Sequence, residues 1–363
     1  MKLSKLFPSG RVQPPRPSPS EMPEEKTPRV LADLDYANLR PSDLPYTVPY
    51  YAGATIDLPR TSPLYRSKSL KTCHLRAFAY ASAYIAGLFH YKPTPMIQSK
   101  IILIRAPFPM VMKYGTEIQL SEASTLHFIA EKTSIPVPKV YCAFEHRGMR
   151  FILMEFVKGK RLSDVWGKTT LAGRELLLKQ IEEHFTQLQN IPHPRPGAIC
   201  SVDIGPLFDR RMDKHGRGFG PFANEKDFNN FLRCGVTDTS QLIPVAGRFE
   251  NNEAREEVSE MIATQDTRNH KIRFTHGDAH SRNFLVKGQK LVAWIDFEMA
   301  GFFPEHWEYT TAMTTCKDTF YDNSWWKQEL RKILKEYPKE LQGEIIRQSR
   351  LDWKVREVLP RTA

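Results

Sequence analysis

The sequence predicts an α+β protein with two lobes, a small lobe rich in strands followed by a larger, mainly helical lobe. Between residues 98 and 157, apolar residues come in short β-branched or aromatic-flanked runs, which are typical of strands. After Gly159 they recur at helical spacing instead. The clearest helical stripe consists of Leu177, Ile181, Phe185 and Leu188. This change of period predicts a hinge between the lobes near Glu155–Lys158.

The small lobe is expected to hold four strands and one helix. Two of the apolar runs flank the stiff turn Ala106–Pro109, so a hairpin is predicted there. Ser121 can cap a helix that continues to about Lys132, and Pro136 and Pro138 end it. The predicted strands are Lys100–Ile104, Met110–Tyr114, Val140–Phe144 and Arg150–Phe156.

The larger lobe is expected to combine helices with three short strands. A Pro- and Gly-rich segment, residues 192–221, is predicted to be a long ordered connection. The last helix is expected to begin at a Ser324 cap and to end before Pro338. The predicted helices are Leu171–Asn190, Glu225–Arg233, Asn251–Thr264 and Trp325–Glu336, and the predicted strands are Lys271–Phe274, Phe284–Val286 and Leu291–Ile295. A solvated helix face is predicted for the acidic residues Glu253, Glu256, Glu257 and Glu260.

These patterns divide the chain into four segments. Residues 1–50 form an extension that we expect to be disordered, because seven of the 27 prolines fall within the first 30 residues and little apolar surface is available for burial. Residues 51–97 form a helical extension, with a helix expected over about Lys68–Leu88. Residues 98–157 form the small lobe, and residues 158–363 form the larger lobe.

Composition narrows the class of protein. The 363 residues carry a net charge of +11, but Lys and Arg are scattered and form no block of five, which argues against a nucleic-acid surface. Five cysteines without a CxxC pair argue against a disulfide framework or a zinc site and favour a reducing compartment. The longest uncharged stretch near the N-terminus, residues 77–89, is too short to span a bilayer. We therefore expect a cytoplasmic protein with neither nucleic-acid nor membrane partners; the basic, acid-free first 20 residues leave a mitochondrial location as the alternative.

One stretch carries most of the information about chemistry. It reads THGDAHSRNFLV from Thr275 to Val286, and VAWIDFE follows at residues 292–298. Kinases have a catalytic loop of the form H-R-D-x-x-x-x-N, followed by a short hairpin and a metal-binding Asp. The same order and five-residue gap occur here in His276, Asp278, Asn283 and Asp296. The sequence therefore predicts a protein-kinase-like, two-lobed fold.

Phosphoryl transfer explains these residue types. The reaction requires a carboxylate that accepts the hydroxyl proton, and hard oxygen ligands for Mg²⁺. Asp278 suits the first role, and Asn283 and Asp296 suit the second. The predicted activity is ATP- and Mg²⁺-dependent transfer of the γ-phosphoryl group to a hydroxyl of a small molecule.

A lysine is also required to hold the ATP phosphates. Lys113 lies on a predicted strand, and Glu122 on the following helix can pair with it, as in the strand-lysine and helix-glutamate pair of kinases. Glu117 is a second acidic residue near enough in the sequence to be considered.

The motif HGDAHSRN…IDFE resembles the H-G-D-x-H-x-x-N…I-D-W/F-E pattern of aminoglycoside phosphotransferase-like kinases, which are related to choline kinases. The fungal branch of that family has segments similar to VMKYG, SIPVPKV, ILMEFVKGKRL, GPFANEKDFNNFL and AGFFPEHWEY. The resemblance covers roughly residues 98–320. It implies an ATP site between the lobes, with the adenine held by backbone groups near Glu155 and Val157. It also implies Asp278 as the base, with Asn283 and Asp296 on Mg²⁺.

Other interpretations remain open. The turn before the lysine strand reads Ala-Pro-Phe-Pro and lacks glycine, so fewer backbone amides can approach a phosphate. A pseudokinase-like binding protein of the same fold is therefore the alternative function. His276, Asp278 and His280 could instead form a hydrolase-type metal site. The acceptor is not identified by the motif. The basic chain fits a polycationic antibiotic poorly, and a choline-like amine, a sugar and a secondary metabolite are equally open.

Overall fold

The computed structural model describes residues 74–82, 100–104, 109–146, 148–212, 218–241, 252–314 and 324–351. Within these ranges, none of the helices has both the length and the apolar character needed to cross a membrane. The expected disordered extension, residues 1–50, lies outside the described residues, as do positions 106–108 of the predicted hairpin turn.

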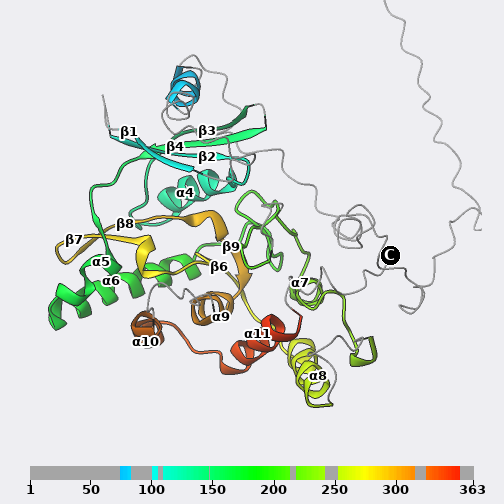
Figure 1. Cartoon of the computed structure of the whole chain (residues 1–363). Coiled ribbons are helices and arrows are strands. Elements are labelled where there is room, and N and C mark those ends of the chain that lie inside the picture. Colours follow the sequence, from blue (N-terminus) through cyan, green and yellow to red (C-terminus); the bar gives the residue numbers. More distant parts are fainter. Residues whose placement is uncertain are drawn as a thin grey trace, which may run out of the picture. The chain divides into compact units, whose positions relative to one another are not determined.

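The small lobe is built on an antiparallel sheet with strand order β1-β2-β4-β3. Its strands are β1 Lys100–Ile104, β2 Met110–Gly115, β3 Val140–His146 and β4 Met149–Glu155, which confirms the four predicted strands. Helix α4, Ser121–Lys132, lies on one face of this sheet, and a helix over residues 74–82 lies on the other (Figure 1). Both faces are therefore covered.

Side chains alternate between these two faces, because successive residues of a strand point to opposite sides. In β4, Phe151 joins the apolar cluster that includes Ala79 of the outer helix, whereas Ile152 joins the cluster that includes Leu126 of α4. The register places Lys113 of β2 directly opposite Ile152. Lys113 therefore faces α4 and the larger lobe.

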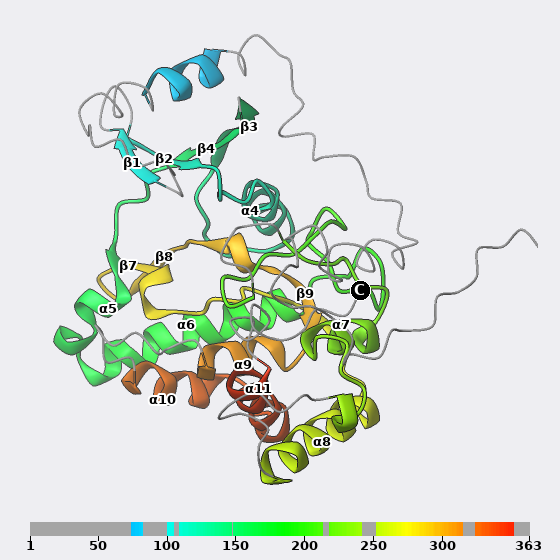
Figure 2. The same ribbon diagram turned by 45° about the vertical axis from the view of Figure 1, so that its right-hand side comes forward.

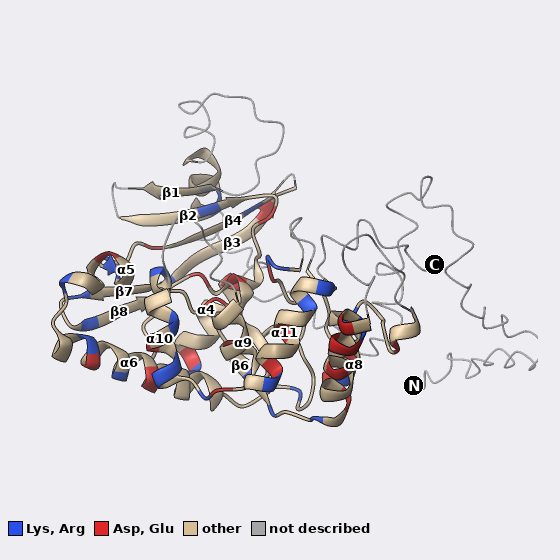
Figure 3. Cartoon of the chain, turned by 60° about the horizontal axis from the view of Figure 1, so that its bottom comes forward, with Lys and Arg blue, Asp and Glu red and all other residues tan. Residues whose placement is uncertain are grey.

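The larger lobe contains two small sheets, and most of its helices lie on the side of these sheets away from the small lobe (Figure 2). Strands β5 Lys160–Arg161, β7 Phe284–Lys287 and β8 Lys290–Trp294 form one sheet, and β6 Ile272–Thr275 pairs with β9 Gly301–Pro304 in the other. The main helices are α5 Leu162–Val165, α6 Leu171–Gln189, α7 Glu225–Leu232, α8 Asn252–Thr267, α9 Trp307–Thr314, α10 Ser324–Ile333 and α11 Pro338–Arg350. The acidic face predicted for α8 is confirmed for Glu253, Glu256 and Glu260, which are exposed, whereas Glu257 is half-buried and pairs with Arg350 (Figure 3).

Two predictions about helix ends are wrong. Ser121 does not cap α4, because the capping position falls on Leu120, whose backbone is already helical and whose side chain makes no capping hydrogen bond. Pro338 does not close the predicted helix Trp325–Glu336, which ends at Ile333; instead it begins α11, a helix that the sequence pattern did not predict. Proline lacks a backbone N–H, and a helix tolerates this at its first position, where that N–H would have no intrahelical partner. The sequence pattern alone could not separate these two uses of proline.

Candidate active site

Lys113 and Glu122 form a buried ion pair in the small lobe. The Lys113 Nζ atom lies 2.7 and 2.9 Å from the two carboxylate oxygens of Glu122. Glu122 lies in the first turn of α4, which packs against the sheet face toward which Lys113 points. The predicted pair is therefore confirmed, with Glu122 rather than Glu117 as the partner.

Asp296 approaches the same lysine from the larger lobe. Its Oδ1 atom lies 2.6 Å from Lys113 Nζ. The residue follows β8 and has left-handed backbone angles, with φ 68° and ψ 54°. This conformation is unfavourable by about 1 kcal/mol or more for residues other than glycine, and it is found preferentially where a functional geometry requires it. The backbone thus turns sharply to direct Asp296 at Lys113.

Lys113, Glu122 and Asp296, here called the Lys113 cluster, each shift the pKa values of the others. Burial would lower the pKa of the Lys113 ammonium, but Glu122 and Asp296 outweigh burial and raise it. Burial raises the pKa of Glu122 to about 7, and Lys113 counteracts part of that rise. Burial would raise the pKa of Asp296, but Lys113, together with Arg210, outweighs burial and lowers it. Lys113 therefore stays protonated, and Asp296 stays ionised.

A third carboxylate, Glu298, completes the acidic group. The oxygens of Glu122, Asp296 and Glu298 lie within 4.8 Å of one another. Hard oxygen donors at this spacing are suited to a small divalent cation such as Mg²⁺. Burial raises the pKa of Glu298, and the nearby Asp296 raises it further.

Asp278 and Asn283 are joined in the loop between β6 and β7. The Asn283 Nδ2 atom donates to the Asp278 carbonyl at 2.9 Å and to its Oδ2 atom at 3.0 Å. Asp278 is half-buried, whereas Asn283 is buried. Ile295 N donates to the Asn283 carbonyl at 2.9 Å, so this loop lies against the strand end that leads into Asp296. The two halves of the predicted motif are therefore adjacent in space.

His276 holds this loop from inside. Its Nδ1 atom accepts a hydrogen bond from Asp278 N at 3.2 Å, and its Nε2 atom lies 3.1 Å from the Ile295 carbonyl. The side chain is fully buried, and burial lowers its pKa. Both ring nitrogens are engaged by backbone groups of the loop and of Ile295, which argues against the hydrolase-type metal site with Asp278 and His280.

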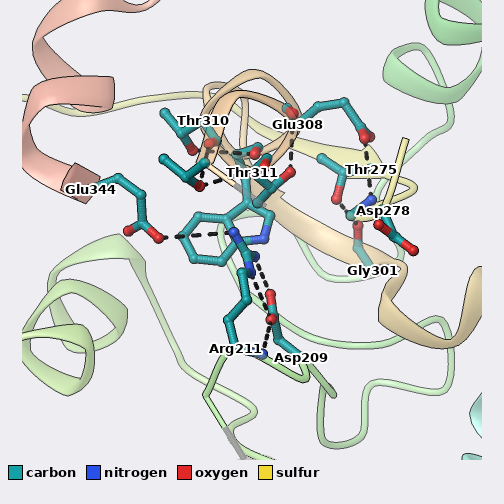
Figure 4. A network of polar contacts seen from close by, with 12 residues as sticks. Asp209, Arg211, Thr275, Asp278, Gly301, Glu308, Thr310, Thr311 and Glu344 are labelled. Carbon is teal, nitrogen blue, oxygen red and sulfur yellow. Dashed lines mark hydrogen bonds and ion pairs between the residues drawn. The ribbon is translucent and has the colours of Figure 1, made fainter. Parts of the chain in front are cut away.

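Glu308 is a positioning residue that sequence reasoning missed. It accepts hydrogen bonds from His276 N at 2.6 Å and from Gly277 N at 3.3 Å (Figure 4). The residue lies on α9 and is buried, and burial raises its pKa to about 7. An acidic residue between two aromatic residues, Trp307 and Tyr309, both of which are buried, was the available signal.

The conformation and packing of the loop require glycine at position 277. Its φ is +78°, and a Cβ atom at this position would lie 2.5 Å from the Met299 carbonyl oxygen. Both the backbone conformation and the close approach exclude other residues without a shift of the chain. The loop can therefore pack directly against the segment after Asp296.

Arg210 reaches the acidic group from the connection between α6 and α7. Its Nε atom lies 2.5 Å from Glu298 Oε1. Partial desolvation of this mostly exposed side chain would lower the pKa of the guanidinium, but Glu298, then Asp296 and Asp278, outweigh it and raise the pKa. No motif in the sequence marked Arg210, because its position depends on the path of a long irregular segment.

Glu155 and Val157 lie at and after the end of β4, with Glu155 exposed and Val157 half-buried. The Glu155 carboxylate accepts a hydrogen bond from Lys139 N at 3.2 Å. No hydrogen bond or ion pair between described residues joins either residue to the Lys113 cluster. Of the sequence-predicted site residues, the structure thus unites Lys113, Glu122, Asp278, Asn283 and Asp296.

Known proteins are similar to this chain in sequence. Residues 117–340 match the family described as "Phosphotransferase enzyme family". The Aminoglycoside 3'-phosphotransferase of Niallia circulans is 25% identical over 191 residues, which are 52% of this chain and 62% of that protein. The chain thus spans less than two thirds of that relative.

Solved structures of lower identity are also similar. The crystal structure of aminoglycoside phosphotransferase APH(4)-Ia is 14% identical, with 75% of this chain and 88% of that chain covered and a TM-score of 0.49. The gentamicin complex of APH(2")-IIa is 15% identical, with 74% and 85% covered and a TM-score of 0.45. The family match extends over more than half of the chain. It includes Glu122, Asp296 and the loop from His276 to Asn283, called the catalytic-type loop below because of its kinase-like motif. The chain therefore belongs to the phosphotransferase enzyme family.

Proposed function

We propose that the protein is an ATP- and Mg²⁺-dependent phosphotransferase that moves the γ-phosphoryl group of ATP to a hydroxyl of a small molecule, with Asp278 as the base. The observation that carries this proposal is the position of Lys113. It is held at 2.6 to 2.9 Å by one carboxylate from each lobe, Glu122 and Asp296. A lysine fixed in this way is suited to holding phosphates, because its flexible stem is restrained.

The residues fit a magnesium nucleotide. Asn283 and Asp296 offer the oxygen ligands that Mg²⁺ prefers, and Lys113 offers the cation for the phosphates. The backbone of Glu155 and Val157 would hold the adenine. When bound, MgATP would supply the phosphoryl group and positive charge beside the oxygens that become more negative during transfer.

Asp278 would accept the proton of the acceptor hydroxyl. Its carboxylate is half-buried and is oriented by Asn283 Nδ2 and by the backbone hydrogen bond to His276. Glu308 supports this geometry by binding the two preceding backbone N–H groups. A carboxylate held in position before the reaction lowers the barrier by avoiding reorientation during proton transfer.

The acceptor is best sought among neutral hydroxyl compounds. Arg210 pairs with Glu298 at 2.5 Å and thereby offsets one of the carboxylates beside Asp296. A polycationic aminoglycoside would have to compete with this guanidinium and with a chain of net charge +11. Sugars and singly charged amino alcohols meet less opposition.

The test is ADP formation by the purified full-length chain against a panel of sugars, amino alcohols and aminoglycosides, with Mg²⁺ or with EDTA. We expect Mg²⁺-dependent ADP formation that one class of acceptor stimulates, with the phosphorylated acceptor detected by mass spectrometry. MgATP binding without acceptor-dependent turnover would favour the alternative, a pseudokinase-like binding protein.

A further inference from the structure

Two histidines face each other in the larger lobe, away from the active-site loop. Strands β6 and β9 pair antiparallel, and the pairing continues past their ends, since Glu305 N donates to the Lys271 carbonyl at 2.8 Å. The next pair in this register is His270 and His306. Their ring centroids lie 4.6 Å apart. Sheet register has therefore placed two imidazoles side by side from segments far apart in the sequence.

A carboxylate completes the group. Glu225, the first residue of α7, lies with its Oε1 atom 2.7 Å from His270 Nδ1 and 3.7 Å from His306 Nε2. The three side chains are 7%, 11% and 11% exposed. One potential ligand atom from each residue lies within 4.8 Å of the other two.

We propose that Glu225, His270 and His306 form a binding site for one divalent transition-metal ion, with zinc as the favoured ion. Two imidazole nitrogens and one carboxylate oxygen are a donor set that zinc uses in proteins. The site is separate from the carboxylates around Lys113, and the inference does not depend on the proposed phosphotransferase activity.

The geometry is close to that of a tetrahedral ion. Zinc bonds of about 2.0–2.1 Å separate neighbouring ligand atoms by about 3.3 Å in a tetrahedral site. The observed separations of 2.7 and 3.7 Å lie on either side of this value. For these two pairs, binding would change the separations by about 0.4 to 0.6 Å, and the hydrogen bond between Glu225 and His270 would open. The ligand nitrogens of the two histidines lie within 4.8 Å of each other.

The second nitrogen of His270 already has the partner that a metal-bound histidine usually has. Its Nε2 atom lies 3.2 Å from Glu340 Oε1 on α11, and Glu340 is paired with Arg268. Histidine ligands of metals generally donate their other N–H to a carboxylate, which fixes the ring orientation. This contact leaves His270 Nδ1 directed toward Glu225 and the proposed ion.

Neither ring nitrogen of His306 has a normal hydrogen-bond partner among the described residues. Its Nδ1 atom is buried and has no hydrogen-bond partner among the described residues. Its Nε2 atom is 3.7 Å from Glu225, which is too far for a normal hydrogen bond. Buried polar groups without partners are rare. An ion bound at Nε2 would give that nitrogen a partner, while Nδ1 would still have none among the described residues.

A small cavity adjoins the three residues. It has a volume of about 30 Å³, and its lining includes Glu225, His270, His306 and Glu340. That volume accommodates about two water molecules. One water could complete a four-coordinate zinc site, whereas a six-coordinate ion would require three further ligands and more room.

The ion would join the elements that hold the catalytic-type loop. His270 precedes β6, which leads into His276, and His306 precedes α9, which carries Glu308. Both elements contact the loop, and the metal would tie their starts to each other and to α7. Its expected effect is therefore on stability.

The test uses metal-free full-length protein titrated with Zn²⁺ by calorimetry, and with Co²⁺ as a spectroscopic probe. We expect one zinc ion per chain with a dissociation constant of about 1 μM or lower, a raised unfolding temperature, and the visible absorption of tetrahedral cobalt. A millimolar excess of Mg²⁺ should not displace the zinc, because the donor set is not one that Mg²⁺ prefers.

Variants separate this site from other zinc-binding groups. Glu225→Gln and His306→Gln should each weaken zinc binding at least tenfold and abolish the cobalt spectrum. His184→Gln is the matched control, since His184 Nδ1 is also buried without a partner among described residues; it should leave binding unchanged. Asp296→Asn should also leave zinc binding unchanged. The proposal would be overturned if the parent bound no zinc or if both site variants still bound it. Loss of zinc binding in Asp296→Asn would also overturn it. Circular dichroism of the metal-free variants establishes that they are folded.

Discussion

The Lys113 ammonium lies 2.6 Å from the Asp296 carboxylate, and the two residues are 183 positions apart in the chain. Lys113 is on the central part of the small sheet, and Asp296 follows the last strand of the β5-β7-β8 sheet. The same lysine binds Glu122 of α4 through both carboxylate oxygens. The cation therefore joins the two lobes at the point where we place the phosphates.

Replacing Asp296 by asparagine should weaken the binding of MgATP at least tenfold and remove most of its dependence on Mg²⁺. Asparagine has almost the same shape but lacks the negative charge that attracts the metal. Calorimetric titration with ATP at several Mg²⁺ concentrations measures the effect. Asp164→Asn is the control, because Asp164 is exposed and lies in α5. Equal affinity of Asp296→Asn and the parent would refute the metal role.

Replacing Asp278 by asparagine should lower turnover by about two to four orders of magnitude, the range typical of general-base loss. MgATP affinity should change little, since we assign Asp278 to the acceptor rather than to the nucleotide. Steady-state kinetics with an acceptor from the panel, combined with nucleotide titration, separates the two effects. Near-normal turnover would exclude Asp278 as the base, and a matching loss of MgATP affinity would move it into the metal site.

Gly277→Ala should destabilise the protein and reduce turnover. The added Cβ atom would lie 2.5 Å from the Met299 carbonyl oxygen, at a φ of +78°. Gly148→Ala is a matched control, because Gly148 has a φ of +73° and open space around the added atom. Both variants bear the backbone cost of about 1 kcal/mol, and Gly277→Ala should lose about 1–3 kcal/mol more through the clash. Urea unfolding measures the difference, and equal losses would show that the loop yields without strain.

Glu344→Gln should lower the free energy of unfolding at neutral pH by about 3 kcal/mol. Glu344 binds Arg347 at 2.6 and 2.7 Å and faces Arg211 (Figure 4). Burial would raise its pKa, but Arg347 and Arg211 outweigh burial and lower the pKa to about 2.

The sign of the pH dependence follows from this lowered pKa. The ionised Glu344 stabilises the fold fully above the ordinary glutamate pKa of about 4.5, and the contribution is lost as pH falls toward 2. The difference between Glu344→Gln and the parent should therefore be constant from pH 6 to 8 and shrink below about pH 4.5. Glu329→Gln, which breaks a pair with the exposed Lys332, should cost at most about 0.5 kcal/mol. A difference that grows in acid would contradict the assignment.

Features that depend on spacing along the chain could be predicted from the sequence. The order His276, Asp278, Asn283 and Asp296 indicated the catalytic-type loop and the hairpin after it. Alternation along β2 puts Lys113 on one face of its strand, and the helix after that strand offered Glu122 as its partner. These relationships are local, because period and hydrogen-bonding pattern within one element determine which side a residue faces.

Features that depend on how distant segments pack could not be predicted. Glu308 reaches the loop from α9, Arg210 comes from an irregular connection, and sheet register pairs His270 with His306. Each contact is decided by the register and packing of elements that are separate in sequence, and no local pattern encodes them. The same limit explains the mistaken roles of Ser121 and Pro338, because capping depends on backbone angles that the surrounding fold imposes.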